Sequence, residues 1–193
     1  MPAYRTPAAP PTPQSRATPQ PHPDPVSIRQ RPTQAAERVT PGDWEDDLII
    51  GRGNRSAIGT LVQRVTGATM LVHLPDGYKP EQLRGPLTVQ LMTLPASLRR
   101  SLTWDQGAQM LDCKQIAAAA GVDIYFCDPH SPWQRGLNEN TNGLLRQYFP
   151  RGTDLNVHSA EDLARVAAEL NDRPRKRLGF RKPIELIGPL MLR

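Results

Sequence analysis

Residues 48–74 read LIIGRGNRSAIGTLVQRVTGATMLVHL, and this stretch decides the fold. It holds three runs rich in aliphatic and β-branched residues, Leu48–Ile50, Ile58–Val65 and Thr69–Leu74, separated by residues typical of turns. Short apolar runs broken in this way are characteristic of strands that follow one another closely. The stretch therefore predicts three antiparallel strands.

Helices and strands alternate after these three runs. Periodic leucines, an alanine-rich segment, short apolar runs and a Ser159/Asp162 capping pattern support the assignments. The predicted elements are a helix over Pro80–Leu94, a strand over Ser101–Trp104, a helix over Met110–Ala120, a strand over Val122–Cys127, and helices over Gln134–Tyr148 and Ser159–Asn171. The order βββαβαβα predicts an α/β fold with a mixed five-stranded sheet and helices on both faces, the ribonuclease H-like arrangement.

The composition predicts one folded domain preceded by a tail. The chain has 193 residues, 38% of them hydrophobic, which suffices for a modest core. Nine of its 21 prolines fall within the first 25 residues, and this density prevents regular helices and sheet ladders. We expect a disordered tail over 1–25, a connector over 26–41 with a helical turn near Gln34–Val39, a folded core domain over 42–187 and a C-terminal tail over 188–193.

Charge is distributed unevenly along the chain, whose net charge is +5. Residues 41–134 carry ten acidic and eight basic side chains, whereas residues 135–193 carry seven acidic and eleven basic ones. The acidic middle suits metal ligation and the basic end suits a polyanion such as DNA. The alternative is an ordinary solvated surface.

Cysteine use and hydropathy exclude several classes of protein. Cys113 and Cys127 form no CxxC pair and have no histidine at zinc-binding spacing, which favours a reduced protein in the cytoplasm. The apolar stretches are too short to span a bilayer, and the N-terminus has no apolar signal core. We therefore expect no membrane role.

Three carboxylates are the candidate catalytic groups. Asp47 and Asp105 adjoin predicted strands, and Glu139 opens a predicted helix, with 33 residues between the last two. Carboxylates brought together in this way can hold two divalent cations for in-line phosphoryl transfer. Alternation along a strand puts Glu45 and Asp47 on one face and Asp46 on the other.

Each carboxylate has a structural alternative. Asp47 can pair with Arg52 or Arg55, because a buried carboxylate needs a partner. Asp105 can form an Asx-turn or cap the next helix. Glu139 can face solvent in a first helical turn, where its charge favours the helix dipole.

A second group of residues is predicted to contact DNA. Amide, basic and aromatic side chains near Glu139 and in the basic segment after Asn171 suit phosphate contacts and base stacking. The candidates are His130, Trp133, Arg135, Asn138, Asn142, Arg146, Arg173, Arg175 and Lys176. The alternatives are loop packing for Trp133, a surface position for His130 and solvated charge for the basic segment.

Extended motifs in this chain resemble the insertion sequence thirty family of bacterial transposases. The resemblance runs from about Ile28 to Glu185. The motifs are GDWEDDLIIG (42–51), SAIGTLV (56–62), TWDQG (103–107), YFCDPHSPWQRG (125–136), NENTNGLLRQYFP (138–150) and LNDRPRKRLG (170–179).

The resemblance implies a retroviral-integrase-like core whose Asp-Asp-Glu triad falls on Asp47, Asp105 and Glu139. It also implies Mg²⁺, with Mn²⁺ as a substitute, insertion sequence ends and target DNA as substrates, and a homo-oligomer on DNA near the bacterial nucleoid. Family members usually carry an upstream helix-turn-helix region that has no counterpart here, so we expect a truncated copy. The chain also departs from the family pattern at Asp46, usually Gly, at Gln109, usually Glu, and at Cys113, where His is common.

The leading hypothesis is therefore the catalytic domain of a transposase that cleaves and joins DNA. A second hypothesis is a catalytically silent DNA-binding or oligomerising remnant of such an enzyme. A third is a ribonuclease H-like nuclease with no role in transposition.

Overall fold

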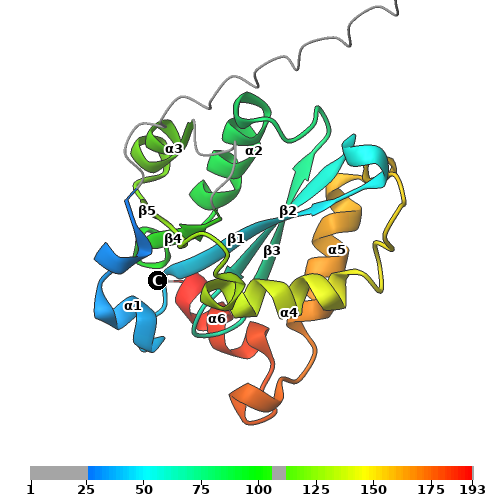
Figure 1. Ribbon diagram of the computed structural model, residues 1–193. Coiled ribbons are helices and arrows are strands. Elements are labelled where there is room, and N and C mark those ends of the chain that lie inside the picture. The colour runs from blue at the N-terminus through cyan, green and yellow to red at the C-terminus, as the bar shows by residue number, and fades with distance from the viewer. Residues whose placement is uncertain (1–25, 106–111, 193) are drawn as a thin grey trace, which may run out of the picture.

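The computed structural model of the protein describes residues 26–105 and 112–192. A mixed sheet runs through this part in the order β3-β2-β1-β4-β5 (Figure 1). Its strands are β1 (Asp43–Ile50), β2 (Ala57–Gln63), β3 (Thr69–Leu74), β4 (Ser101–Trp104) and β5 (Asp123–Phe126). The first three pair antiparallel, whereas β1 pairs parallel with β4 and β4 with β5. The predicted mixed five-stranded sheet is confirmed.

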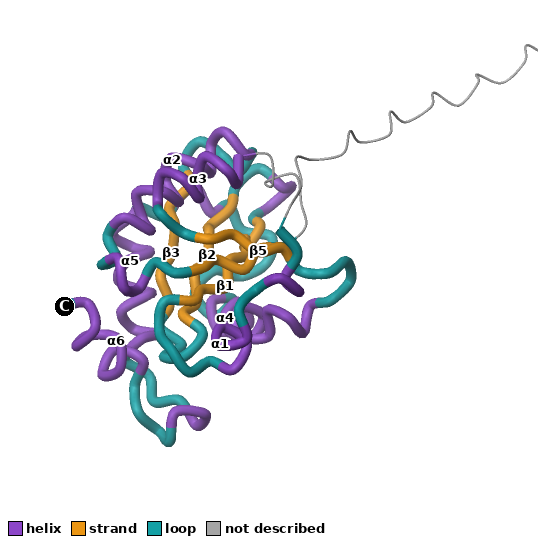
Figure 2. The backbone as a smooth tube through the Cα atoms, turned by 90° about the vertical axis from the view of Figure 1, so that its left-hand side faces the viewer, coloured by secondary structure: helices purple, strands orange, loops and turns teal. Residues whose placement is uncertain are grey.

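Helices cover both faces of the sheet, as predicted (Figures 1 and 2). The longer ones are α2 (Pro80–Met92), α3 (Cys113–Ala120), α4 (Gly136–Leu145), α5 (Ala160–Asn171) and α6 (Pro183–Met191). One apolar cluster joins α2 and α3 to the face of the sheet that carries Trp44 and Leu61. Another joins α4 and α5 to the opposite face, which carries Ile49 and Ile58. The sheet therefore forms the middle of three layers.

Strand β1 begins at Asp43, five residues before the predicted start at Leu48. The sequence did not predict this extension, because residues 43–47 are mostly acidic and buried charges are normally excluded from strands. Tertiary partners satisfy two polar side chains of this extension: the Asp43 carboxylate accepts a 2.6 Å hydrogen bond from Ser101, and the Trp44 indole donates a 2.7 Å hydrogen bond to the Leu98 carbonyl. Asp47 therefore lies within β1 and not at its start.

The helices follow the prediction more closely than this strand does. Helix α2 continues through Pro86, and the predicted capping box of α5 is present, with Ser159 and Asp162 bonded reciprocally. Helix α4 ends at Leu145, three residues earlier than predicted, and α6 extends through most of the predicted C-terminal tail. Met110 and Leu111 lie outside the described residues. None of the described helices is both long enough and apolar enough to cross a membrane.

The predicted connector packs against the domain. Its short helix α1 (Thr33–Glu37) overlaps the predicted helical turn. The guanidinium of Arg31 donates a 2.8 Å hydrogen bond to the Thr103 hydroxyl, and Arg64 donates a 3.1 Å hydrogen bond to the carbonyl of buried Ala35. These contacts attach the connector to β4 and to the end of β2. The predicted tail over 1–25 lies outside the described residues.

Both outer strands of the sheet carry additional hydrogen bonds. Ser27 forms a parallel bridge with Phe126 of β5, and the Phe126 amide donates a 2.9 Å hydrogen bond to the Val26 carbonyl. On β3, the Asn171 side chain accepts from the Thr69 amide at 2.8 Å and donates to the Thr69 carbonyl at 2.9 Å. Segments distant in sequence thus bond to the sheet at both edges.

Candidate active site

The register of two parallel strands brings Asp47 and Asp105 together. Glu45 of β1 lies opposite Thr103 of β4. Asp47 and Asp105 each follow two residues later, beyond the last registered pair and at the carboxyl end of β4. Parallel strands end at a common edge, where open α/β sheets gather their ligands. The pairing of β1 with β4 therefore brings the side chains of Asp47 and Asp105 close together.

Arg135 joins these two carboxylates. It ends the short 3-10 helix over Pro132–Arg135, immediately before α4. One terminal nitrogen, Nη1, lies 3.1 Å from Asp47 Oδ1, and the other, Nη2, lies 2.6 Å from Asp105 Oδ2. Burial opposes protonation of the guanidinium, but the charges of Asp47 and Asp105 outweigh it and raise the pKa of Arg135. Asp47 therefore pairs with an arginine, but with Arg135 and not with the predicted alternatives Arg52 or Arg55.

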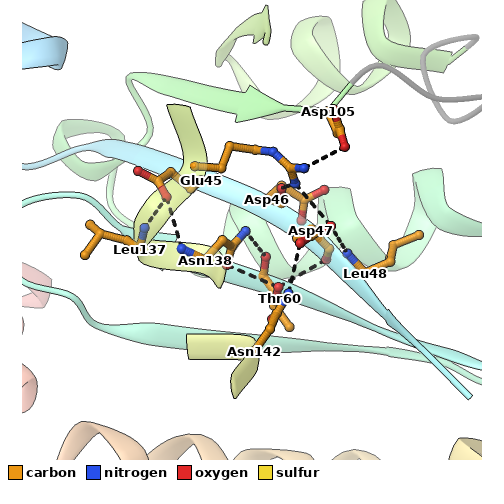
Figure 3. A network of polar contacts seen from close by, with 10 residues as sticks. Glu45, Asp46, Asp47, Leu48, Thr60, Asp105, Leu137, Asn138 and Asn142 are labelled. Atoms are coloured by element: carbon orange, nitrogen blue, oxygen red, sulfur yellow. Dashed lines mark hydrogen bonds and ion pairs between the residues drawn. The ribbon is translucent and has the colours of Figure 1, made fainter. Parts of the chain in front are cut away.

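Asp47 is oriented by two further hydrogen bonds (Figure 3). Its Oδ1 accepts from the Leu48 amide at 2.9 Å, and its Oδ2 accepts from the Asn142 side chain at 2.9 Å. Asn142, a predicted DNA contact, thus touches a candidate catalytic carboxylate. Charged acceptors make hydrogen bonds of this kind strong, so the rotamer of Asp47 is well fixed.

Glu139 lines the same cavity as Asp47. The cavity has a volume of about 510 Å³, and its wall is formed by Asp47, Leu48, Ile49, Arg135, Glu139, Asn142, Gly143, Arg146 and Arg151. The helical spacing of Glu139, Asn142 and Arg146 places all three on one side of α4. Glu139 is exposed in the first turn of the helix. This exposure also agrees with the alternative that Glu139 simply faces solvent. The cavity combines carboxylates with basic side chains, which suits a metal-bound phosphodiester.

A buried carboxylate fixes α4 to the sheet. Glu45 is fully buried, and its Oε2 accepts 3.1 Å hydrogen bonds from the amides of Leu137 and Asn138 in the first turn of α4. Its Oε1 lies 2.6 Å from Nη1 of Arg64. Burial lowers the pKa of Arg64 to about 10, so this arginine stays charged at neutral pH. Sequence reasoning missed this role of Glu45, although alternation along β1 had placed it on the same face as Asp47.

Asn138 holds the next turn of α4 against β2. Its side chain is fully buried, with Oδ1 3.2 Å from the Thr60 hydroxyl and Nδ2 3.5 Å from the Thr60 carbonyl (Figure 3). The Asn138 side chain was predicted to contact DNA, but in this structure it has no exposed surface for such a contact. The contact between Thr60 and Asn138 instead fixes the distance of α4 from the sheet, and with it the position of Glu139.

Asp46 is a buried carboxyl group next to the site. It lies on the opposite face of β1 from Asp47, as alternation predicted, and is 1% exposed. Neither carboxylate oxygen has a hydrogen-bond partner among the described residues. Burial, and then the charge of Asp47, raise the pKa of the Asp46 carboxyl well above its usual range.

The other predicted DNA contacts divide into two groups. His130, with a positive φ of 57°, and Trp133 are exposed in the loop between β5 and α4. Lys176 is also exposed, beside a second cavity on the other side of α4. The remaining three bond to the protein itself: Arg146 to the carbonyls of Ile50 and Phe149, Arg173 to Gln147 and Tyr148, and Arg175 to the Leu170 carbonyl. Arg151, which lines the 510 Å³ cavity, was not predicted.

The donor chemistry of the site suits a divalent cation. Carboxylate oxygens are the ligands that Mg²⁺ and Mn²⁺ prefer. The side chains of Asp47 and Asp105 are 32% and 57% exposed, so an ion can reach both. Among the described residues, however, no three acidic, histidine or cysteine side chains are already grouped closely enough to hold a metal. The carboxylate oxygens of Asp47 and Asp105 are therefore suitable ligands for a divalent cation. In this structure the guanidinium of Arg135 lies between them.

The mixed sheet and the helices on its two faces define a class of fold, the ribonuclease H-like domains. A chain in the cryo-EM structure of the simian T-cell lymphotropic virus intasome in complex with PP2A regulatory subunit B56 gamma has a similar fold, with a TM-score of 0.55 and 19% sequence identity. The match covers 80% of this chain and 54% of that chain. No family model matches the sequence.

The sequence is similar to those of insertion sequence transposases. The chain is 52% identical over 169 residues to the transposase for insertion sequence element IS1086 of Cupriavidus metallidurans, covering 88% of this chain and 50% of that protein. It is 46% identical over 160 residues to transposase InsI for element IS30A of Escherichia coli K12, covering 83% and 41%. Over most of its own length the chain is therefore similar to IS30-type insertion sequence transposases. It spans half or less of the length of these relatives.

Proposed function

We propose that this chain is the catalytic domain of a transposase that cleaves and joins DNA during transposition of an insertion sequence. The observation that carries the proposal is the register of β1 and β4, in which Glu45 pairs with Thr103, each two residues before one of the aspartates Asp47 and Asp105. Glu139 lines the same cavity as Asp47. The similarity to insertion sequence transposases supports the same activity.

In this proposal Asp47, Asp105 and Glu139 hold two Mg²⁺ ions, for which Mn²⁺ can substitute. Bound ions of this kind activate an attacking oxygen and stabilise a departing one in phosphoryl transfer. Asn142 orients Asp47, while Glu45 and Asn138 position α4 and thereby Glu139. No covalent bond between protein and DNA is needed.

Basic and aromatic side chains would bind the DNA. Arg146 and Arg151 line the cavity and would meet phosphates next to the carboxylates. His130, Trp133 and Lys176 are exposed and would contact DNA further from them. The substrates would be insertion sequence ends and target DNA, bound by a homo-oligomer in the bacterial cytoplasm.

The test is nicking and strand transfer by the purified chain, with Mg²⁺, with Mn²⁺ and with EDTA. We expect activity only with a divalent metal, and its loss in Glu139→Gln. Because Glu139 is exposed, this isosteric change should leave thermal unfolding unchanged. A folded protein that binds DNA but neither nicks nor joins it under any metal condition would instead support a catalytically silent DNA-binding role.

A further inference from the structure

The guanidinium of Arg135 is held by three acceptors at the centre of the site. Nη1 lies 3.0 Å from the Asp46 carbonyl oxygen and 3.1 Å from Asp47 Oδ1, and Nη2 lies 2.6 Å from Asp105 Oδ2. The Arg135 side chain is only 11% exposed. Figure 3 shows Asp47 and Asp105 on neighbouring segments, with their carboxylates directed into the same network. Arg135 thus supplies the positive charge that keeps two acidic groups close together.

A divalent cation bound by the same two oxygens would need the same space. Mg²⁺ binds carboxylate oxygens at roughly 2.0–2.1 Å, closer than any guanidinium nitrogen approaches. An ion bound by both carboxylates would compete for them with Arg135, whose Nη1 and Nη2 already lie 3.1 Å from Asp47 Oδ1 and 2.6 Å from Asp105 Oδ2. Repulsion between the two cations adds to this competition.

We infer that Arg135 is a resident counter-cation of the aspartate pair, which a divalent cation must displace before Asp47 and Asp105 can bind it together. The inference rests on the proposed function, because it assumes that these aspartates are metal ligands. It makes Arg135 a residue that controls metal affinity, acting through the two carboxylates.

The surroundings allow the side chain to leave without refolding the loop. Arg135 borders the 510 Å³ cavity, which offers space for a rotated guanidinium. The loop that carries it is braced by Gln134, which accepts a 2.8 Å hydrogen bond from the Asp128 amide and donates a 3.1 Å hydrogen bond to the Asp128 carboxylate. Displacement therefore requires a change of side-chain rotamer and leaves this brace intact. Once displaced into the cavity, Arg135 would be available for the phosphate contact that its sequence position suggested.

The test is Mn²⁺ affinity, measured by calorimetric titration of the purified chain without DNA. If Arg135 leaves both carboxylates unengaged only about a tenth of the time, its removal should tighten binding roughly tenfold. We therefore expect Arg135→Gln to bind Mn²⁺ about tenfold more tightly than the wild type. Loss of a purely structural residue would weaken binding instead.

Arg146→Gln is the matched control. It removes the same charge from the wall of the same cavity, but Arg146 bonds to the carbonyls of Ile50 and Phe149 and not to the aspartates. We expect it to change Mn²⁺ affinity by less than about threefold, because the aspartates remain engaged and longer-range charge effects are screened. Arg135→Lys is a second variant: it retains the charge but cannot bridge two carboxylates in the same way, so it should tighten binding by an intermediate factor.

The possible outcomes separate the two proposals. Unchanged or weaker Mn²⁺ binding in both Arg135 variants, with wild-type binding that is lost in Asp47→Asn, would overturn the inference and leave the proposed metal site standing. Absence of Mn²⁺ binding in the wild type and in every variant would overturn the metal site itself. Thermal unfolding in EDTA identifies any variant that has lost its fold, and the other Arg135 variant then decides the question.

Discussion

At the scale of the residue, two adjacent aspartates of β1 meet opposite environments. Asp47 faces α4 and has Arg135, Asn142 and a backbone amide as partners. Asp46 faces the other layer, with neither oxygen bonded among the described residues. An unpaired buried carboxylate costs free energy in its charged form, so Asp46 favours its neutral form. The strand alternation that brings one aspartate into the site thus places the other in the interior.

Asp46→Asn should therefore stabilise the protein near neutral pH. Folding raises the pKa of Asp46, so the folded protein retains a proton that the unfolded chain loses above about pH 4. The free energy of unfolding of the wild type therefore falls as the pH rises from about 4 towards the pKa of Asp46 in the folded state. Asp46→Asn has no titrating carboxyl at this position, so its free energy of unfolding should not fall with pH for this reason. We expect its advantage over the wild type to grow between pH 4 and pH 8 by on the order of 1–3 kcal/mol.

Urea denaturation at both pH values, with EDTA present, measures this difference. Asp76→Asn, a change at an exposed aspartate, is the control and should show no comparable trend. An equal advantage for Asp46→Asn at pH 4 and pH 8 would mean that Asp46 is not the titrating group.

At the scale of the element, the site depends on how α4 is attached to the sheet. Glu45 bonds the first turn, Asn138 bonds Thr60 in the next, and Leu145 is buried where the helix ends. Three attachment points along ten residues leave α4 little freedom to tilt or slide. The position of Glu139 relative to Asp47 therefore follows from buried contacts that include neither residue.

Glu45→Gln should loosen this helix. The change leaves Arg64 as a buried charge without its partner, which typically costs about 3–5 kcal/mol. We expect a loss of stability of that size and faster hydrogen exchange at the amides of Leu137 and Asn138. Glu139→Gln is a matched control, because it makes the same chemical change at an exposed position of α4 and should leave both quantities unchanged. Unaltered exchange in Glu45→Gln would show that Glu45 does not hold the helix.

Local patterns predicted most of the elements. Apolar runs and helical spacing predicted the strands and helices in their order along the chain, because each element buries a regular face. The start of β1 was missed because its charges are compensated by Ser101 and Arg64, which lie far away in sequence. The same reason applies to the site. The end of β4 predicted where Asp105 lies, whereas the position of Asp47 within β1 and the place of Arg135 between the two aspartates depend on tertiary contacts.

At the scale of the whole molecule, basic side chains flank α4 on both sides. Arg146 and Arg151 line the cavity on the side of Glu139. Arg175, Lys176 and Arg177 line a smaller cavity of about 210 Å³ on the side of Asn140. A DNA strand crossing α4 would meet positive charge before and after the carboxylates, in keeping with the proposed function.

Lys176→Gln should make DNA binding less dependent on salt. Each phosphate contact contributes about 0.9 to the slope of log K against log salt concentration, so losing one should reduce that slope by about one. Fluorescence anisotropy with duplex DNA at several salt concentrations measures it. Lys114→Gln on α3, at the opposite face of the sheet, is the control and should leave the slope unchanged. Identical slopes for both variants would show that Lys176 does not contact a DNA phosphate.

The extra bonds at the two outer strands have a consequence for assembly. An open strand edge invites a neighbouring chain to extend the sheet, a common route to aggregation. Here the Val26–Ser27 segment occupies part of the β5 edge, and the Asn171 amide occupies the outward groups of Thr69 on β3. Copies of this domain are thereby discouraged from joining sheet to sheet.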